Sequence, residues 1–306
     1  MNRNRHGRVV RRRFSERTDG GVRQPVGCIQ DMPLISRFYG ENMKMDQETL
    51  IKIAEKLHRE AFDANAYYQI LQQYYKNRHD YADEMKISAA FYHTIHDALI
   101  KACFMEIAKL YDSSSGVISI GTLLTECMEN EHFFPEYREM MTVEFDGTTF
   151  SYPIPYTHQL SPQEEVFFKE RVESDRKLFS ALNIPNAEKA PVQVDLTFPA
   201  FLTLYQKRFN ALSKKRGKLR LQRNKWYAHN DEKCLLSNED PRNLSAIYYP
   251  DIKEMIDFAF ECTGLILGAL TDTTYATKYD NIGDWTNTLM MVRIGLKYSN
   301  SDLQKE

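Results

Sequence analysis

A nine-residue stretch of the sequence places an arginine, an amide, a histidine and an acid close together. It spans Arg223–Asp231 and reads RNKWYAHND. Arginine carries a planar, permanently charged fork that matches phosphate oxygens, and histidine is the side chain whose proton moves near neutral pH. Since cleavage of a phosphodiester uses both properties, Arg223 and His229 are candidate catalytic residues.

The segment before this motif is locally basic. Nine lysines and arginines and no acid lie in Lys207–Lys225, although the whole chain has a formal net charge of -2. Such a run is the electrostatic footprint of nucleic-acid binding, but a solvated basic face has the same composition. The candidate RNA-binding residues are Lys214, Lys215, Arg216, Lys218, Arg220 and Lys225.

The spacing of Arg223 and His229 does not suit one straight α-helix. Six residues correspond to about 9 Å of rise and about 240° of rotation, so the two side chains would not face the same spot. Either the helix ends between them, which Asn230 and Asp231 permit, or a second subunit brings another pair of residues to complete the site.

Other chemistry has weaker support in this sequence. The phosphate-loop, nucleophile-elbow, zinc-protease and dinucleotide-binding signatures do not occur in it. His93 and His96 lie one helical turn apart beside Asp97, and with His79-Asp80 they faintly resemble the residue set of HD-type metal phosphohydrolases. Histidines that are hydrogen-bonded for packing are the alternative, and treatment with a chelator separates a metal site from the Arg223 and His229 site.

Helical periodicity predicts two long helices in the first half of the chain. After Asp46, a suitable N-cap, apolar residues step by three and four from Leu50 to Tyr75, as in an amphipathic helix. A second helix, expected from about Asp83 to Tyr111, is apolar nearly all round, which predicts a place at the centre of a helical bundle.

The segment 132–200 has a different character. Seven of the eleven prolines lie there, and VEFDGTTFSYP predicts a short hairpin that turns at Asp146-Gly147. We interpret this segment as an insertion that contains one further helix, from about Ser161 to Leu182.

Helical pattern resumes near Phe201 and runs towards Trp226, with a candidate break or kink at Gly217. A further helix is expected from Pro250 to about Leu270, and a last short one over residues 284–297. Low glycine and plentiful Leu, Ile, Met, Lys and Glu favour helix over sheet. The predicted fold is all-α, a helical bundle with a Pro-rich insertion that contains a small hairpin.

These patterns also divide the chain. The N-terminal arm carries eight arginines by Arg23, lacks the apolar core of a signal peptide, and is expected to be disordered. The predicted parts are the basic arm (1–30), the first half of the bundle (31–131), the insertion (132–200), the second half of the bundle with the Arg/His motif (201–275), and a C-terminal helix and tail (276–306).

Cysteine usage and hydropathy point to the cytoplasm. The five cysteines are scattered, odd in number and without a CxxC pair, so neither a disulfide framework nor a zinc ribbon is predicted. The most apolar segment, Met255–Leu270, carries Asp257 and Glu261 and is too short to span a bilayer. We therefore expect a cytoplasmic protein with no membrane span.

The stretch RNKWYAHND resembles the motif of the HEPN superfamily, whose ribonuclease members carry an arginine, commonly followed by Asn, Asp or His, and then a histidine a few residues further on. Arg223, Asn224 and His229 match that pattern residue by residue. The fuller motif and the sequence KLYDSSSGVISIGTLL are similar to the AbiU-type branch, which is linked to phage abortive infection. The resemblance covers about residues 50–130 and 201–270.

This resemblance implies a HEPN-like bundle that dimerises so that two motifs meet, and a ribonuclease that needs no metal or other cofactor. The ribose 2′-OH would attack the adjacent phosphate, His229 would move a proton, and Arg223 would stabilise the charge on the non-bridging oxygens. Asn224 would orient the phosphate or the histidine.

The expected partners are an RNA substrate and a second copy of the chain. Whether an antitoxin or another regulatory partner restrains the activity stays open at this point. The alternative function is a non-catalytic helical module that binds RNA or a partner protein and retains the motif only as a contact surface.

Overall fold

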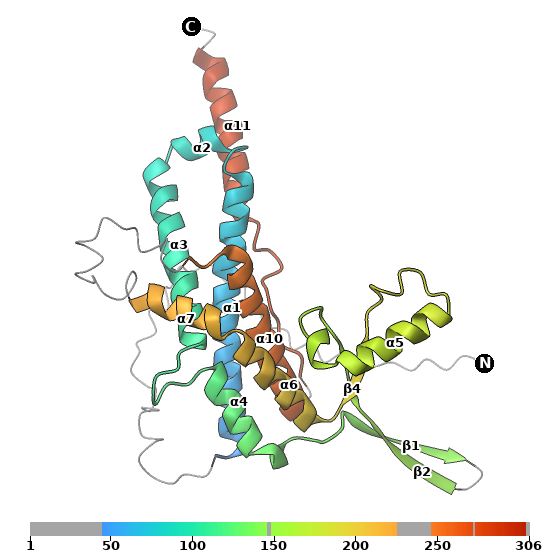
Figure 1. The fold of residues 1–306 in the computed structure, drawn as a ribbon. Helices are drawn as coiled ribbons and strands as arrows, with labels where there is room; N and C mark the ends of the chain where they lie inside the picture. Colours follow the sequence, from blue (N-terminus) through green and yellow to red (C-terminus); the bar gives the residue numbers. More distant parts are fainter. Residues whose placement is uncertain (1–44, 146–147, 225–245, 272, 304–306) are drawn as a thin grey trace. The chain divides into compact units, whose positions relative to one another are not determined.

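The computed structural model of the chain describes residues 45–145, 148–224, 246–271 and 273–303 (Figure 1). These residues belong to one compact unit, Lys44–Glu306. The predicted basic arm 1–30, the hairpin turn at Asp146-Gly147, and the motif residues Lys225 and His229 lie outside the described residues.

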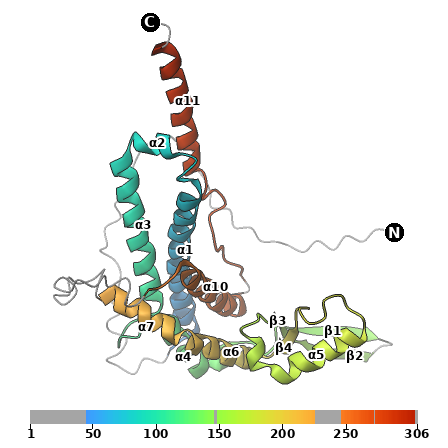
Figure 2. The same cartoon turned by 45° about the horizontal axis from the view of Figure 1, so that its top comes forward.

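Three long helices form the centre of this unit. α1 (Gln47–Asn77) packs along α3 (Ala89–Leu110) and along α10 (Tyr249–Thr271), and the three lie side by side in Figures 1 and 2. Asp46 caps α1 as predicted, because its Oδ1 accepts a hydrogen bond from Thr49 N at 2.8 Å. The apolar face of α1 is completely buried along its first turns, at Leu50, Ala54, Leu57, Ala61 and Ala64.

The second predicted helix is divided, and only its C-terminal half is central. A short helix, α2 (Ala82–Lys86), precedes α3, and the buried residues of α3 all lie between Cys103 and Leu110. Phe91 and Ile95, in the N-terminal half of α3, are 58% and 37% exposed. The predicted central place is therefore wrong for the N-terminal half, where α1 contacts one face of α3, as at His96 and Tyr75, and Phe91 and Ile95 are left exposed.

The Pro-rich segment contains the predicted hairpin and a second small sheet. β1 (Glu139–Phe145) pairs antiparallel with β2 (Thr148–Ile154), and Phe145 lies opposite Thr148, as a turn at Asp146-Gly147 requires. β3 (Tyr156–Gln159) pairs antiparallel with β4 (Gln193–Leu196).

The helix expected over residues 161–182 begins later than predicted. It forms as α5 (Lys169–Ala181), after a single 3-10 turn at Glu165–Phe167. The chain before it is held by Glu164, whose Oε2 accepts a hydrogen bond from Ser161 N at 2.8 Å.

Between the insertion and the motif, the predicted long helix is two helices. α6 (Phe198–Ala211) packs against α4 (Ile120–Glu129), and α7 (Ser213–Gln222) packs against α3 and α6. The break falls at Leu212 rather than at Gly217, which lies inside α7. Leu212 and Leu219 are both buried, so the break turns α7 into a direction that keeps both leucines in the core.

The last helix is longer than predicted and is held against the C-terminal end of α1 and against α2. α11 (Trp285–Leu303) begins where Trp285 Nε1 donates a hydrogen bond to Gln73 Oε1 at 2.8 Å. Arg293 Nε then donates to Glu84 Oε1 at 2.5 Å.

None of the helices that the structure describes is both long and apolar enough to cross a membrane.

Candidate active site

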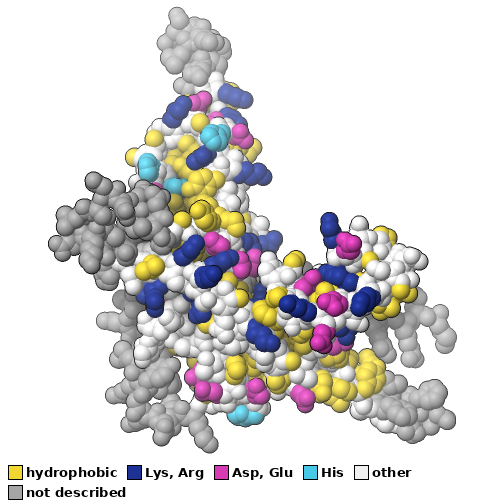
Figure 3. Space-filling model, viewed as in Figure 1, with side chains coloured by type: hydrophobic (Ala, Val, Ile, Leu, Met, Phe, Trp, Pro, Cys, Tyr) yellow, Lys and Arg dark blue, Asp and Glu magenta, His cyan; other side chains and the backbone are white. Residues whose placement is uncertain are grey.

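The basic helix α7 presents different cations on different faces. Leu212 and Leu219 fix one face in the core. The arginines at positions 216, 220 and 223 follow each other at steps of four and three, so they form one stripe along the helix. Figure 3 shows lysine and arginine side chains gathered over this part of the surface, with acidic side chains among them.

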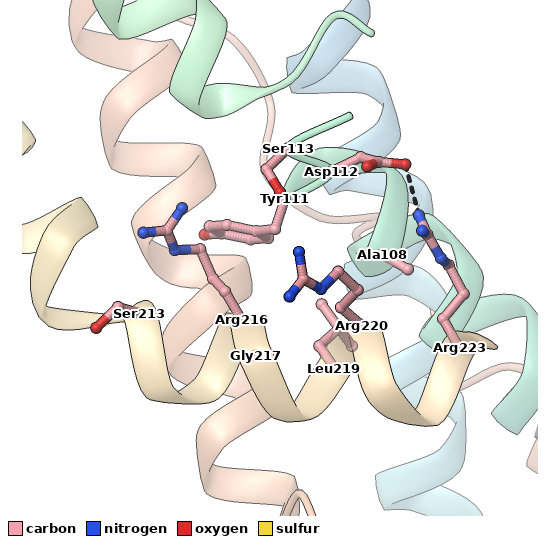
Figure 4. Close-up of a pocket in the computed structure, with 10 residues that line it drawn as sticks. All are labelled: Ala108, Tyr111, Asp112, Ser113, Ser213, Arg216, Gly217, Leu219, Arg220 and Arg223. Atoms are coloured by element: carbon pink, nitrogen blue, oxygen red, sulfur yellow. Dashed lines mark hydrogen bonds and ion pairs between the residues drawn. The ribbon is translucent and has the colours of Figure 1, made fainter. Parts of the chain in front are cut away.

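The arginine stripe faces a pocket between α7 and the end of α3. Its volume is about 160 Å³. Figure 4 shows the three arginines on the α7 side and Tyr111, Asp112 and Ser113 on the opposite side. The lining residues are Ala108, Tyr111, Asp112, Ser113, Ser213, Arg216, Gly217, Leu219, Arg220 and Arg223.

Arg223, the arginine of the motif, is held by an acid from another helix end. It occupies the C-cap position of α7, and its Nη1 donates a hydrogen bond to Asp112 Oδ2 at 2.5 Å. The two side chains are 20% and 15% exposed, so the ion pair is largely shielded from water. Asn224 Oδ1 accepts a hydrogen bond from Arg223 Nε at 3.1 Å, which places this motif residue beside the arginine. Among the described residues Arg223 Nη2 has no hydrogen-bond partner.

Asp112 is itself fixed by the turn that follows α3. Its Oδ1 accepts hydrogen bonds from Ser114 N at 2.9 Å and from Ser114 Oγ at 2.7 Å. Gly116 completes this turn with a φ of +76°, in the left-handed region that favours glycine. Burial by itself would raise the pKa of the Asp112 carboxyl, but the hydrogen bonds from Ser114 and Arg223 outweigh burial and hold that pKa below its ordinary value. Asp112 is therefore ionised at neutral pH and accepts from Arg223 as a carboxylate.

The predicted RNA-binding lysines of α7 lie away from the pocket. Lys215 Nζ forms ion pairs with Asp251 Oδ1 at 2.9 Å and with Glu254. Lys218 Nζ donates a hydrogen bond to the carbonyl of Ala246 at 3.1 Å. Lys214 is exposed. The described part of the predicted basic surface therefore separates into an arginine stripe in the pocket and lysines on other faces of the same helix.

The second candidate site, around His93 and His96, is engaged in local contacts. His96 Nε2 hydrogen-bonds with Tyr75 Oη at 2.9 Å, and Asp97 lies 3.3 Å from His96 Nδ1 and 3.4 Å from His93 Nδ1. No group of three histidine, cysteine, aspartate or glutamate side chains within the described part of the chain is arranged to hold a metal ion.

Sequence reasoning missed most of the pocket wall. Asp112 lies in the run KLYDSSSGVISIGTLL, but the sequence does not indicate that it contacts Arg223, which lies 111 residues further along the chain. Tyr111 is buried and donates a hydrogen bond from its hydroxyl to the carbonyl of Met255 at 2.6 Å, while its ring lines the pocket. The run YDSSSG contained the signal, since a helix end followed by small polar residues is a usual place for ligand contacts.

The comparison with protein families gives a match for this chain. It matches the HEPN_AbiU2 family, described as AbiU2, over residues 47–288. The chain belongs to the HEPN_AbiU2 family. The matched range includes Asp112, Arg223 and His229, and it also runs through the Pro-rich segment, which the sequence motifs alone left outside. The comparisons with curated proteins and with solved structures give no match.

Membership in this family accounts for the fold class. The described part of this HEPN_AbiU2 protein is mainly helical, with two small antiparallel sheets, and this confirms the predicted HEPN-like bundle with a small hairpin. The family also suggests a role in abortive infection or of the ribonuclease type. The predicted roles of Arg223, Asn224 and His229, and the predicted domain boundaries, stay predictions.

Proposed function

We propose that this HEPN_AbiU2 protein is a metal-independent endoribonuclease that acts in phage defence or as a toxin. The single observation that carries the proposal is the geometry of Arg223. Its guanidinium is oriented by Asp112 and Asn224 at the rim of a pocket that three arginines and one acid line. A fixed fork of this kind suits the stabilisation of charge on a phosphate undergoing attack.

In the proposed reaction, the ribose 2′-OH attacks the adjacent phosphorus and the bond to the 5′ oxygen of the next nucleotide breaks. Arg223 binds the non-bridging oxygens, His229 moves a proton between the substrate and solvent, and Asn224 keeps the arginine in place. The products are a 2′,3′-cyclic phosphate and a free 5′-hydroxyl. DNA lacks the 2′-OH and cannot follow this route.

The ion pair with Asp112 also favours a second candidate function. An arginine that joins α7 to α3 through a carboxylate has a structural task, and the motif would then be part of a helical module that binds RNA or a protein without cleaving it. The two functions differ in what Arg223 contributes: in the second it contributes only to stability and binding.

Cleavage of RNA by the purified protein in excess EDTA tests the proposal. We expect cleavage in EDTA, 2′,3′-cyclic phosphate ends, and no cleavage of DNA of the same sequence. Arg223→Ala and His229→Ala should each lower the rate by at least about a hundredfold, which is the usual scale for losing a charge-stabilising or proton-transferring group.

A matched control is Lys214→Ala, which removes a cation from the same helix outside the pocket. Thermal unfolding of each variant separates loss of chemistry from loss of fold. If RNA stays intact, or if both motif variants cleave at the wild-type rate, the binding module is the better description.

A further inference from the structure

The end of the pocket away from Asp112 holds cations without an acidic partner. Arg216 and Arg220 line it, and neither forms an ion pair with any described residue. The Nε of Arg216 is buried and has no hydrogen-bond partner within the described part of the chain. Its guanidinium carbon lies 3.8 Å from the centroid of the Phe209 ring, so this ring covers one face of the guanidinium group.

Arg220 is exposed, where a cation needs no acidic partner, but Arg216 is partly buried, and the other partly buried cations of α6 and α7 each pair with an acid. Arg208 pairs with Glu164 and Glu261, Lys215 pairs with Asp251 and Glu254, and Arg223 pairs with Asp112. Arg216 has the same intermediate burial but no carboxylate among the described residues. A partly buried charged group with no counter-ion is less stable than a paired one, and the contact with Phe209 offsets only part of that difference. The pocket is therefore electrostatically incomplete without an anion.

The chemistry of the pocket selects the kind of anion. Guanidinium groups bind the oxygens of a phosphate in a bidentate manner. The three positive charges of the arginine stripe exceed the single negative charge of Asp112 in the pocket. Ser113 lies on the wall opposite the arginines, and its hydroxyl is a further hydrogen-bond donor there. A volume of about 160 Å³ admits a phosphate group, since one water needs only about 10–15 Å³ of the same measure.

We propose that Arg216 and Arg220 form a second phosphate site, which binds the RNA phosphate next to the one held at Arg223. This inference rests on the proposed function, because it takes the Arg223 phosphate to be the one that is cleaved. Arg220 lies about 4.5 Å and Arg216 about 10.5 Å along the helix axis from Arg223, so the stripe follows a strand rather than one isolated phosphate. The substrate is then a strand with at least one phosphate beside the scissile one.

The test measures binding of short 2′-O-methyl oligonucleotides, which cannot be cleaved by 2′-OH attack. The probes are UpU, the same dinucleotide with a 5′ phosphate, the same dinucleotide with a 3′ phosphate, and inorganic phosphate as a competitor. One of the two terminal phosphates should raise the affinity of the wild-type protein about tenfold or more, as for hydrogen bonds to a charged group. Arg216→Gln and Arg220→Gln should each remove most of that gain.

Lys214→Gln is the matched control, because it removes one positive charge from the same helix outside the pocket. It lowers affinity for all three dinucleotides together through general electrostatics and leaves the gain from the terminal phosphate intact. A second pair of variants, Gly217→Glu and Gly217→Gln, changes the pocket without replacing any arginine. No described residue outside the helix backbone comes within 4 Å of the position where a Cβ at Gly217 would lie, so both side chains fit among the described residues. Only the glutamate should abolish the gain, because it supplies an anion of its own.

Three results overturn the second site: no gain from either terminal phosphate, a gain that Arg216→Gln and Arg220→Gln leave intact, or a gain that Lys214→Gln removes equally. Inorganic phosphate that binds through Arg216 and Arg220 while neither terminal phosphate helps also overturns it, and shows a site for free phosphate instead. Since no probe is cleaved, these results are independent of catalysis. Cleavage of RNA without a terminal-phosphate gain leaves the proposed function standing, and a gain without cleavage leaves the second site standing.

Discussion

At the scale of single residues, the contact between Asp112 and Arg223 sets the direction of the motif arginine. A carboxylate next to a phosphate-binding arginine repels the phosphate, so it weakens ground-state binding while it fixes the geometry of the fork. A residue that only stabilises the fold would affect neither constant of the reaction in a folded variant. We therefore predict that Asp112 is a positioning residue in the proposed reaction.

Asp112→Asn tests this role, because the amide keeps the size of the side chain and loses its charge. We expect kcat to fall roughly tenfold to a hundredfold, the usual scale for a misplaced catalytic group, while KM stays the same or falls. Steady-state cleavage of an RNA oligonucleotide measures both constants. Asp97→Asn, an exposed change in α3 away from the pocket, is the control, and a rise in KM at constant kcat in Asp112→Asn would contradict positioning.

A second residue-scale feature is the buried carboxylate of Glu164. Burial would raise its pKa, but hydrogen bonds from His158 and Ser161 and the charge of Arg208 outweigh burial and lower the pKa from 4.5 to about 2. Since the folded-state pKa is depressed, the carboxylate stabilises the fold fully above about pH 4.5, and this stabilisation is lost as the pH falls towards 2. The network joins the insertion to α6 and, through Arg208 and Glu261, to α10.

Glu164→Gln should therefore matter more at neutral pH than in acid. The difference in unfolding free energy between wild type and Glu164→Gln should be about 2 kcal/mol smaller at about pH 3 than at about pH 6. Urea denaturation at the two pH values measures it. Glu173→Gln, an exposed change in α5 at a residue with no ion pair among the described residues, provides a control. A difference that does not change with pH would show that the hydrogen bonds of Glu164 do not depend on its charge.

At the scale of elements, glycines mark where two helices approach closely and where they do not. A Cβ at Gly121 in α4 would lie 2.7 Å from Phe209 Cζ, inside the packing of α4 against α6. At Gly217 in α7, no described residue outside the adjacent helix backbone has an atom within 4 Å of the same position. The first glycine is required by packing, and the second is an unforced glycine in the middle of a helix.

Gly121→Ala and Gly217→Ala form a matched pair of substitutions with opposite expected signs. Gly121→Ala should destabilise the protein by about 1–3 kcal/mol, since the ring of Phe209 must shift. Gly217→Ala should stabilise it by about 0.5–1 kcal/mol, because alanine lowers the entropy cost of helix formation. Thermal unfolding of both variants checks the signs, and equal destabilisation would show that α7 does not have the surroundings described.

Some of the helices and strands could be predicted from the sequence, and others could not. The periodicity of Leu50, Ala54 and Leu57 was sufficient for α1, and the pair Asp146-Gly147 was sufficient for the β1–β2 hairpin, because both signals are local. The pairing of β3 with β4 was not predicted, since more than thirty residues separate the strands and each is only four residues long. The break at Leu212 was missed because it depends on burying two leucines against distant helices rather than on a helix-breaking residue.

For the candidate site, too, some features could be predicted from the sequence and others could not. The residue types of Arg223 and Asn224 and their family pattern were readable from the sequence, and so was the basic run. Which cations of that run face a pocket and which pair with acids depended on the direction of α7 against α3 and α10. Lys215 and Arg216 are neighbours in sequence, yet the first pairs with Asp251 and Glu254 and the second has no described acidic partner.

At the scale of the whole molecule, the proposed chemistry calls for two copies of the chain. Transesterification needs a base for the 2′-OH and an acid for the leaving oxygen, and one histidine fills only one of these roles at a time. Two motifs in a symmetric dimer supply two histidines and two arginines around one phosphate. We predict that the active unit is a dimer with one composite site.

A tagged heterodimer separates a composite site from two independent ones. One subunit is wild type and the other carries both Arg223→Ala and His229→Ala, and its cleavage rate is compared with that of the wild-type homodimer at equal dimer concentration. Independent sites retain about half of the activity by simple counting of intact sites, whereas a shared site retains much less, because the phosphate loses one arginine and one proton-transfer group together. A heterodimer that keeps half of the rate, or a wild-type protein that cleaves RNA as a monomer, would require Arg223 and His229 to meet within one chain.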